Sequence, residues 1–224
     1  MEILDAIKAR HSVRHYFDMA IEPEKIEKLQ TLVDEYNTIS GLHIQLITNE
    51  PRSFGESLLA RYGKFSGVTN YFAMIGKKNN MLDETVGYYG EKLVLEAQMM
   101  GLNTCWVGLS YKKIDNVLDI DDDEKLVCLI SVGYGVTQGV DHKRKMPKQI
   151  SDTPIDNAPM WYRQGIKAAL LAPTAINQQK FKFSLISENK VRAKAGWGFY
   201  SKVDLGIVKY HFEIGAGTQN FIWE

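Results

Sequence analysis

The amino-acid sequence predicts a fold of the α/β or α+β class, in which helices flank a mixed sheet. Segments with helical spacing alternate with short apolar runs along the 224 residues, which is typical of this class. The runs 71–76 and 126–132 are apolar apart from Ser131 and stop at a glycine, as buried strands do. No run reaches the roughly 20 apolar residues that a membrane-spanning helix needs.

The N-terminal part of the chain predicts two helices and one strand. Helical spacing over 3–7 predicts a short helix that ends near Arg10, with extended chain over 11–16. Pro23 is expected to open the second helix, because proline is favoured at the first helical position. Alternation over 42–46 then predicts a half-buried strand.

The middle of the chain predicts a long helix and a buried strand. Apolar positions over 85–100 indicate a mostly buried helix, with Gly101 as its C-cap. Residues 105–108 are expected to end a strand, and 121–124 to form an acidic turn before the buried strand 126–132.

A polar, proline-containing linker at 139–159 separates these elements from a shorter unit, and regular structure is expected to lapse there. A helix over 165–172 and a strand over 181–187 are predicted beyond it. Segments 51–67 and 189–200 are rich in glycine and aromatic residues, and we expect them to be the loops that select the ligand.

Parts of the chain echo each other. Residues 165–187 echo the helix and strand around 32–48 at an offset of 139, and residues 203–223 echo 86–106 at an offset of 117. Such a repeat predicts a pseudo-dimer within one chain, packed as one integrated unit. The predicted repeats are 1–150 and a shortened 151–224.

Charge and cysteine usage exclude several classes of protein. Lys+Arg and Asp+Glu number 27 each, so no global field favours nucleic acid or an anionic membrane. Cys105 and Cys128 lie in apolar runs without the spacing of metal ligands, which favours buried, reduced thiols. Acidic residues interrupt the apolar positions of residues 1–7, unlike in a signal peptide, so we expect a cytoplasmic protein.

One candidate binding segment contains two arginines and a serine. In extended chain Arg10, Ser12 and Arg14 point to the same side, with His11 between them. Converging guanidinium and hydroxyl donors suit an anion or the polar edge of a ring. A solvated helix end with incidental arginines is the alternative, and on its own this segment favours that alternative.

A second candidate segment, 172–179, places small residues and amides between a helix and an aromatic strand. Small side chains would let a flat ligand lie against the backbone, and Asn177 could bond both a donor and an acceptor on its edge. An ordinary polar loop explains the segment equally well.

Taken together, segments 10–14, 101–108, 132–135 and 172–183 resemble the flavin-dependent nitroreductase family, and the resemblance spans nearly the whole chain. In that family the first segment grips the phosphate and pyrimidine edge of FMN, a strand end faces the ring, and later basic residues hold the phosphate. The last segment reaches the flavin from the other subunit of a homodimer. The resemblance implies FMN-binding roles here for Arg10, His11, Ser12, Arg14, Trp106, Val107, Gly108, Lys143, Arg144, Pro173, Thr174, Ala175, Asn177 and Gln179.

Each half of this chain retains only part of that site. Residues 37–42 lack the proline and the paired amides, and the second half lacks the Arg-x-Ser-x-Arg pattern. We therefore expect a nitroreductase-like fold of two pseudo-symmetric halves, with one FMN in a monomeric pseudo-dimer. The resemblance implies an NAD(P)H oxidoreductase that passes hydride through the flavin N5 to a nitroaromatic, quinone or similar small acceptor, with ping-pong kinetics.

Two alternatives stay open. Because each repeat has lost half of its site, the chain could bind or sense flavin without efficient turnover. It could also be an apo relative whose pocket is closed by Tyr16, Phe65 or Trp197.

Overall fold

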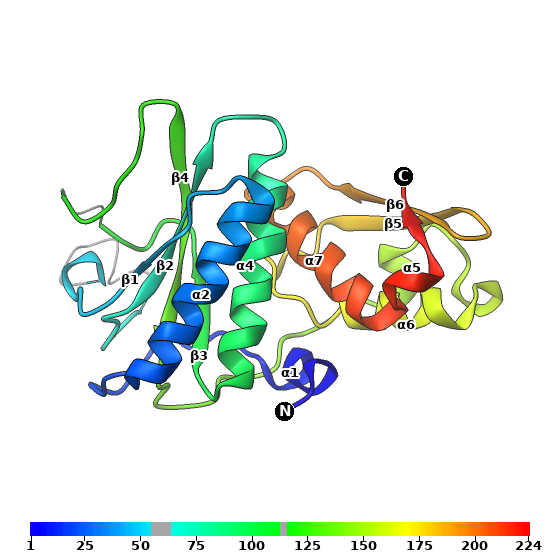
Figure 1. Cartoon of the computed structure of the whole chain (residues 1–224). Coiled ribbons are helices and arrows are strands. Elements are labelled where there is room, and N and C mark those ends of the chain that lie inside the picture. The colour runs from blue at the N-terminus through cyan, green and yellow to red at the C-terminus, as the bar shows by residue number, and fades with distance from the viewer. Residues whose placement is uncertain (55–63, 113–115) are drawn as a thin grey trace. The chain divides into compact units, whose positions relative to one another are not determined.

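The computed structural model describes residues 1–54, 64–112 and 116–224 of the chain (Figure 1). They form two compact units. The C-terminal unit consists of residues 1–8, 83–91 and 141–224, and the N-terminal unit of 9–82 and 92–140. Helix α4, Leu82–Met99, contributes its first half to the C-terminal unit and its second half to the N-terminal unit. The repeat boundaries inferred from sequence similarity stay a prediction.

The N-terminal unit contains a four-stranded sheet in the order β1–β2–β4–β3, with every neighbouring pair antiparallel. Its strands are β1 (Gln45–Ile47), β2 (Tyr71–Lys77), β3 (Asn103–Val107) and β4 (Glu124–Gly133). Strands β2 and β4 are central and almost wholly buried, which explains their continuous apolar sequence. The two predicted buried strands are confirmed.

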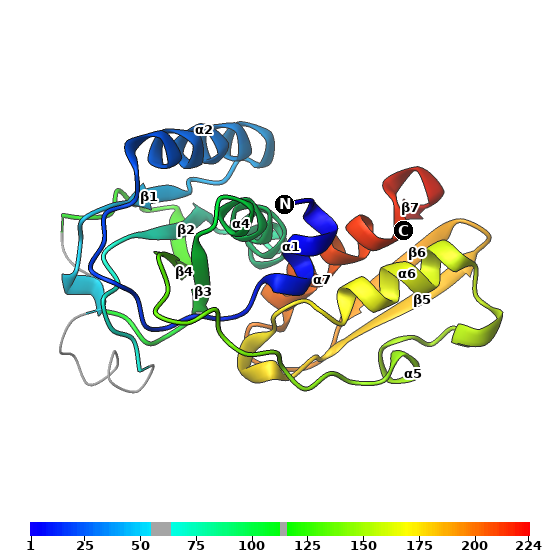
Figure 2. The ribbon, with the colours of Figure 1, turned by 90° about the horizontal axis from the view of Figure 1, so that it is seen from below.

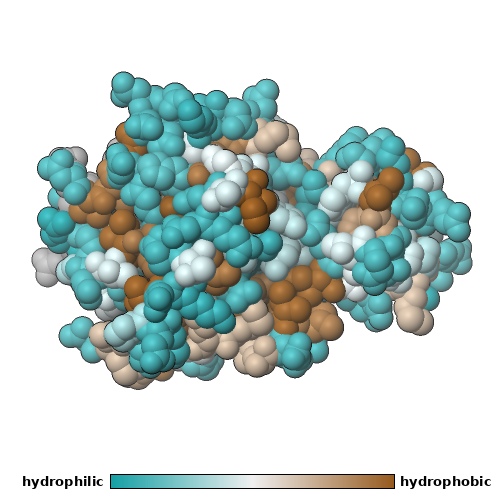
Figure 3. Space-filling view, in the orientation of Figure 1, coloured by the Kyte–Doolittle hydropathy of each residue, from teal (hydrophilic) through white to brown (hydrophobic). Residues whose placement is uncertain are grey.

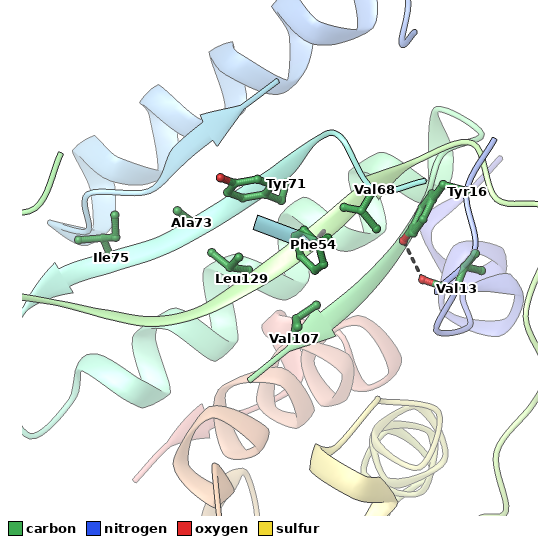
Figure 4. Packing of buried hydrophobic residues seen from close by; sticks show 9 residues of the cluster. All are labelled: Val13, Tyr16, Phe54, Val68, Tyr71, Ala73, Ile75, Val107 and Leu129. Atoms are coloured by element: carbon green, nitrogen blue, oxygen red, sulfur yellow. Dashed lines mark hydrogen bonds between the residues drawn. The ribbon is translucent and has the colours of Figure 1, made fainter. Parts of the chain in front are cut away.

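A hydrophobic cluster on this sheet anchors the chain before helix α2, Pro23–Ser40 (Figure 4). Val13 and Tyr16 pack with Phe54, Tyr71 and Leu129. The Tyr16 hydroxyl donates to the Val13 carbonyl at 2.8 Å, and this bond is drawn in the figure. The predicted extended chain over 11–16 is therefore confirmed, and it is fastened to the core by its apolar members.

The first helix begins and ends where the sequence predicts, and the second begins at the predicted Pro23. Helix α1 spans Ile3–Ala9 and α2 spans Pro23–Ser40, with the proline in the first turn. Gly41 follows α2 with φ 71°, and its N–H donates to the Asn37 carbonyl at 2.9 Å.

Polar residues make up most of the face drawn in Figure 3, with apolar residues in separate groups between them.

The C-terminal unit contains helices and a three-stranded sheet. Its α-helices and strands after residue 140 are α5 (Pro147–Ile150), α6 (Met160–Ala169), β5 (Phe181–Ser187), β6 (Lys190–Ala195), α7 (Ser201–Ala216) and β7 (Ile222–Trp223). Strands β5 and β6 are antiparallel, and β6 and β7 are parallel (Figure 2). Phe183 of β5 stacks on Phe212 of α7, with ring centroids 4.8 Å apart, and Tyr162 of α6 packs edge-on to Phe212. Single 3₁₀ turns occupy Arg52–Phe54, Ile155–Asn157, Ala175–Asn177 and Thr218–Asn220.

Two predictions for this unit are wrong. The segment 189–200 is not a loop throughout, because residues 190–195 form β6. The linker 139–159 also carries regular structure, since Pro147 starts the one-turn helix α5. Helix α6 begins at Met160, directly after Pro159, earlier than expected. Proline marks a helix start as readily as an interruption, and the pattern alone does not separate the two.

The element order of the two units is similar. Elements α6, β5, β6, α7 and β7 follow the same order as α2, β1, β2, α4 and β3. Strands β2 and β3 are both antiparallel to β4, so they run parallel to one another, as β6 and β7 do. No strand follows β7 in the described part of the chain. The repeat stays a prediction, and this order agrees with it.

None of the helices that the structure describes has the length and apolar character needed to cross a membrane.

Candidate functional site

The predicted site residues fall into two groups, one in each unit. The N-terminal unit holds the first seven: Arg10, His11, Ser12, Arg14, Trp106, Val107 and Gly108. The C-terminal unit holds the other seven: Lys143, Arg144, Pro173, Thr174, Ala175, Asn177 and Gln179.

In the N-terminal unit, the Arg-x-Ser-x-Arg segment lies beside strand β3. The Val13 N–H donates to the Thr104 carbonyl at 3.0 Å, and Ser12 forms a parallel bridge with Thr104. Gly139, with φ 74°, passes so close that a Cβ there would lie 2.7 Å from the His11 Cβ. Only glycine fits at this position without displacing the segment.

Three side chains of the segment act on the buried thiol of Cys105. Burial raises the pKa of Cys105, while Arg14, a hydrogen bond from Ser12, and Arg10 each act to lower it. Three of the predicted residues thus lie close enough to Cys105 to affect its ionisation. Arg10 is buried and Arg14 is exposed, so Arg14 is the guanidinium that a ligand can reach directly. Both cysteines are buried thiols and neither belongs to a disulfide, as expected.

Residues 106–108 close strand β3 next to this segment. Val107 belongs to the hydrophobic cluster that contains Val13, so its side chain points into the core. Trp106 and Gly108 are half-buried. Only the backbone at Val107 remains for a ligand, which agrees with the role that the resemblance implies for it.

In the C-terminal unit, the loop before β5 is strained. Ile176, Asn177 and Gln179 have φ values of 48°, 55° and 46°. A left-handed conformation is a genuine outlier for a β-branched residue such as Ile176, and each such residue costs about 1–3 kcal/mol. Ile176 is also 92% exposed, so burial of its side chain does not offset this cost. Strain of this kind is typical of ligand-binding loops.

Amide hydrogen bonds tie this loop to the basic segment 143–145. The buried Gln179 amide accepts from the Lys145 N–H at 2.9 Å and donates to the Lys143 carbonyl at 2.9 Å and to Asn177 Oδ1 at 2.8 Å. Asn177 Nδ2 donates to the same Lys143 carbonyl at 3.0 Å. Both ends of the Gln179 amide therefore bond to groups of the chain itself, so Gln179 positions its neighbours. Asn177 and Lys143, in contrast, are exposed.

Arg144, the other predicted phosphate ligand, forms an ion pair with Asp141. Lys143 is the predicted cation whose backbone carbonyl accepts from the amides of Asn177 and Gln179, and the residue is exposed. The structure thus brings Lys143, Asn177 and Gln179 together within one unit.

Asp204, which was not among the predicted site residues, fixes the position of the 174–179 loop. Its carboxylate accepts the Ala175 N–H at 2.8 Å and the Gln178 amide at 2.7 Å. Burial raises the pKa of Asp204 to about 6, against the lowering effect of these two hydrogen bonds. A single aspartate in the apolar run 203–208 is the sequence signal that could have found it, because such a carboxyl needs buried partners.

Replacing Asp204 with asparagine is expected to remove one pH dependence of stability. The pKa of Asp204 is about 6 in the folded protein against an ordinary 3.8. The contribution of this carboxyl group to the free energy of unfolding is therefore fully present below about pH 4, and it is lost as pH rises through about 6. The free-energy difference between wild type and variant should change by roughly 3 kcal/mol across that interval. Urea unfolding at several pH values measures it, and a constant difference would contradict the assignment.

Within residues 1–54, 64–112 and 116–224, no group of three or more His, Cys, Asp and Glu side chains could hold a metal ion.

Comparison with known proteins assigns the chain to a family. The family model described as "Putative TM nitroreductase" matches residues 2–216. A "putative nitroreductase" from Thermotoga maritima is 20% identical with a TM-score of 0.69, and the alignment covers 96% of this chain and 83% of that one. No curated protein matches the sequence.

Two further solved structures share the fold. A "putative nitroreductase in complex with FMN" from Desulfovibrio desulfuricans is 17% identical with a TM-score of 0.54, over 69% of this chain and 98% of that one. A "Putative NADH Oxidase" from Clostridium acetobutylicum is 20% identical with a TM-score of 0.52, over 67% and 99%. The fold is thus nitroreductase-like, and the chain belongs to the nitroreductase family that the matching model describes.

Proposed function

We propose that the chain binds one FMN and acts as an FMN-dependent NAD(P)H oxidoreductase on small aromatic acceptors. The observation that carries the proposal is the strained loop 174–179, which hydrogen bonds hold beside the basic segment 143–145. Family membership and a fold neighbour described as a complex with FMN support the choice of ligand.

The predicted site residues of each unit carry side chains that suit FMN. Arg14 and Lys143 are exposed cations for a phosphate or an electron-rich ring edge, and Asn177 is an exposed amide. Pro173, Thr174 and Ala175 are small enough to lie against a flat ring. When bound, FMN would supply the hydride-transfer chemistry, so the chain's own residues need only bind, orient and tune it.

Replacing Arg14 with glutamine is expected to lower the reduction potential of bound FMN. A guanidinium at the pyrimidine edge would stabilise the negative charge of the reduced ring, and glutamine keeps hydrogen bonds but no charge. We expect a shift of about 30 mV, which corresponds to roughly 1.4 kcal/mol for two electrons. Spectroelectrochemical titration measures the potential. An unchanged potential would sink the role of Arg14.

The decisive test of the function is reconstitution with FMN followed by stopped-flow mixing with NADH and NADPH. The expected result is one FMN per monomeric chain and fast bleaching by at least one nucleotide, then reoxidation by a nitroaromatic or quinone. A stable yellow colour would favour the flavin-binding alternative, and failure to take up flavin the apo alternative. Two flavins in an obligate dimer would contradict the proposed pseudo-dimer.

A further inference from the structure

The connection between β6 and α7 lines a surface pocket of the C-terminal unit. The pocket has a volume of about 610 Å³ and is lined by residues 195–202 and Asp83. Trp197 is 97% exposed and Phe199 is 58% exposed. Large aromatic side chains carry the greatest apolar surface of any residue, so two of them exposed at one pocket mark a binding surface.

Backbone contacts fix the loop that presents these rings. The Gly196 N–H donates to the Lys180 carbonyl at 2.7 Å, and the Gln178 amide donates to the Phe199 carbonyl at 2.7 Å. A Cβ on Gly198 would lie 2.4 Å from Gln178 Oε1, so a larger residue there would displace the Gln178 amide. The exposure of Trp197 is therefore imposed by its well-bonded neighbours.

The same contacts join the aromatic loop to the candidate site. Gln178 donates both to the Phe199 carbonyl and to Asp204, which also holds Ala175. Gln178 thus links the loop 196–200 to the strained loop that we assign to the flavin. Since all of these residues belong to the C-terminal unit, the link does not depend on the other unit.

We infer that this pocket binds a planar aromatic ring, stacked on Trp197 and flanked by Phe199, with Asp83 and Lys202 at its polar rim. The volume lies within the range of about 300–1,000 Å³ typical of small-molecule sites. The identity of the ring rests on the proposed function, which supplies two sources: the nucleotide reductant and a free aromatic acceptor. Both share the flat π-surface that a tryptophan face recognises.

The test is calorimetric titration of the FMN-loaded protein with oxidised NAD and, separately, with p-nitrobenzoate, neither of which turns over without a reductant. Trp197→Ala is expected to weaken at least one probe about tenfold, as loss of a stacking partner does. Trp197→Phe should restore most of the affinity. The control is Met160→Ala, because Met160 is an apolar residue that is 67% exposed at the start of α6 and does not line the pocket. This variant should bind both probes with the affinity of wild type.

The probe whose affinity falls in Trp197→Ala shows whether the ring belongs to the nucleotide or to the free aromatic acceptor. If Trp197→Ala binds both probes as wild type does, the inference is overturned. FMN affinity, measured on the same variants, separates the two proposals: a chain that takes up no FMN contradicts the proposed function, and the two titrations of that chain still decide the pocket.

Discussion

Replacing Gly206 with alanine is expected to destabilise the protein by about 3 kcal/mol, at the upper end for an added methyl group. Gly206 lies where α7 crosses the first half of α4 within the C-terminal unit. A Cβ there would lie 2.0 Å from the Glu84 carbonyl oxygen and 2.6 Å from the Tyr88 nitrogen. Both are backbone atoms of a helix, so no side-chain rotation relieves the clash and the helices must separate.

Gly87 makes the reciprocal contact. A Cβ on Gly87 would lie 2.0 Å from the Val203 carbonyl oxygen. The glycine of each helix therefore meets a carbonyl three residues before the glycine of the other helix. Reciprocal contacts of this kind define a two-fold interface between identical subunits. They support the proposal that a family dimer interface has become intramolecular.

Urea unfolding of Gly206→Ala, Gly87→Ala and Lys202→Ala measures the effect. The exposed Lys202 on the same helix is the control and should change stability by less than about 0.5 kcal/mol. If Gly206→Ala were as mild as the control, the close crossing would not exist in solution. Because the two glycines share one crossing, the double variant should cost less than the sum of the single variants.

Local chemistry decided how far the sequence could predict the fold. Pro23 and the apolar runs of β2 and β4 carry strong local signals, and the structure agrees with them. Strand β6 was missed because its polar face dominates: Lys and Arg alternate with Val191, Ala193 and Ala195. Alanines carry little of the alternation that marks a strand.

The candidate site was predictable in its residue types and not in its geometry. The sequence indicates amides at Asn177 and Gln179, yet gives no means of telling that Gln179 bonds inward to the 143–145 backbone. Likewise, Ile176 adopts a left-handed backbone conformation that β-branched residues disfavour. Tertiary hydrogen bonds, above all those to Asp204, impose this conformation, and partners far apart in sequence are invisible to local pattern.

Removing the His211 side chain should be as damaging as crowding the helix crossing. His211 of α7 and Glu91 of α4 are both completely buried, with Nε2 and Oε1 2.8 Å apart. The other ring nitrogen of His211 lies 3.2 Å from the Ala168 carbonyl oxygen. In His211→Leu the Glu91 carboxyl stays buried without this partner, which typically costs about 3–5 kcal/mol.

The double variant Glu91→Leu/His211→Leu tests whether the pair stabilises the fold or only satisfies its own burial. Two leucines remove both buried polar groups, and apolar replacement of a buried pair is often neutral or stabilising by about 1–4 kcal/mol. We therefore expect the double variant to unfold at higher urea than either single variant. Simple additivity of the two single losses would contradict this coupling. Recovery in the double variant would mean that the pair selects which faces of α4 and α7 meet, since any other pairing of these faces would separate the Glu91 carboxyl from the His211 ring.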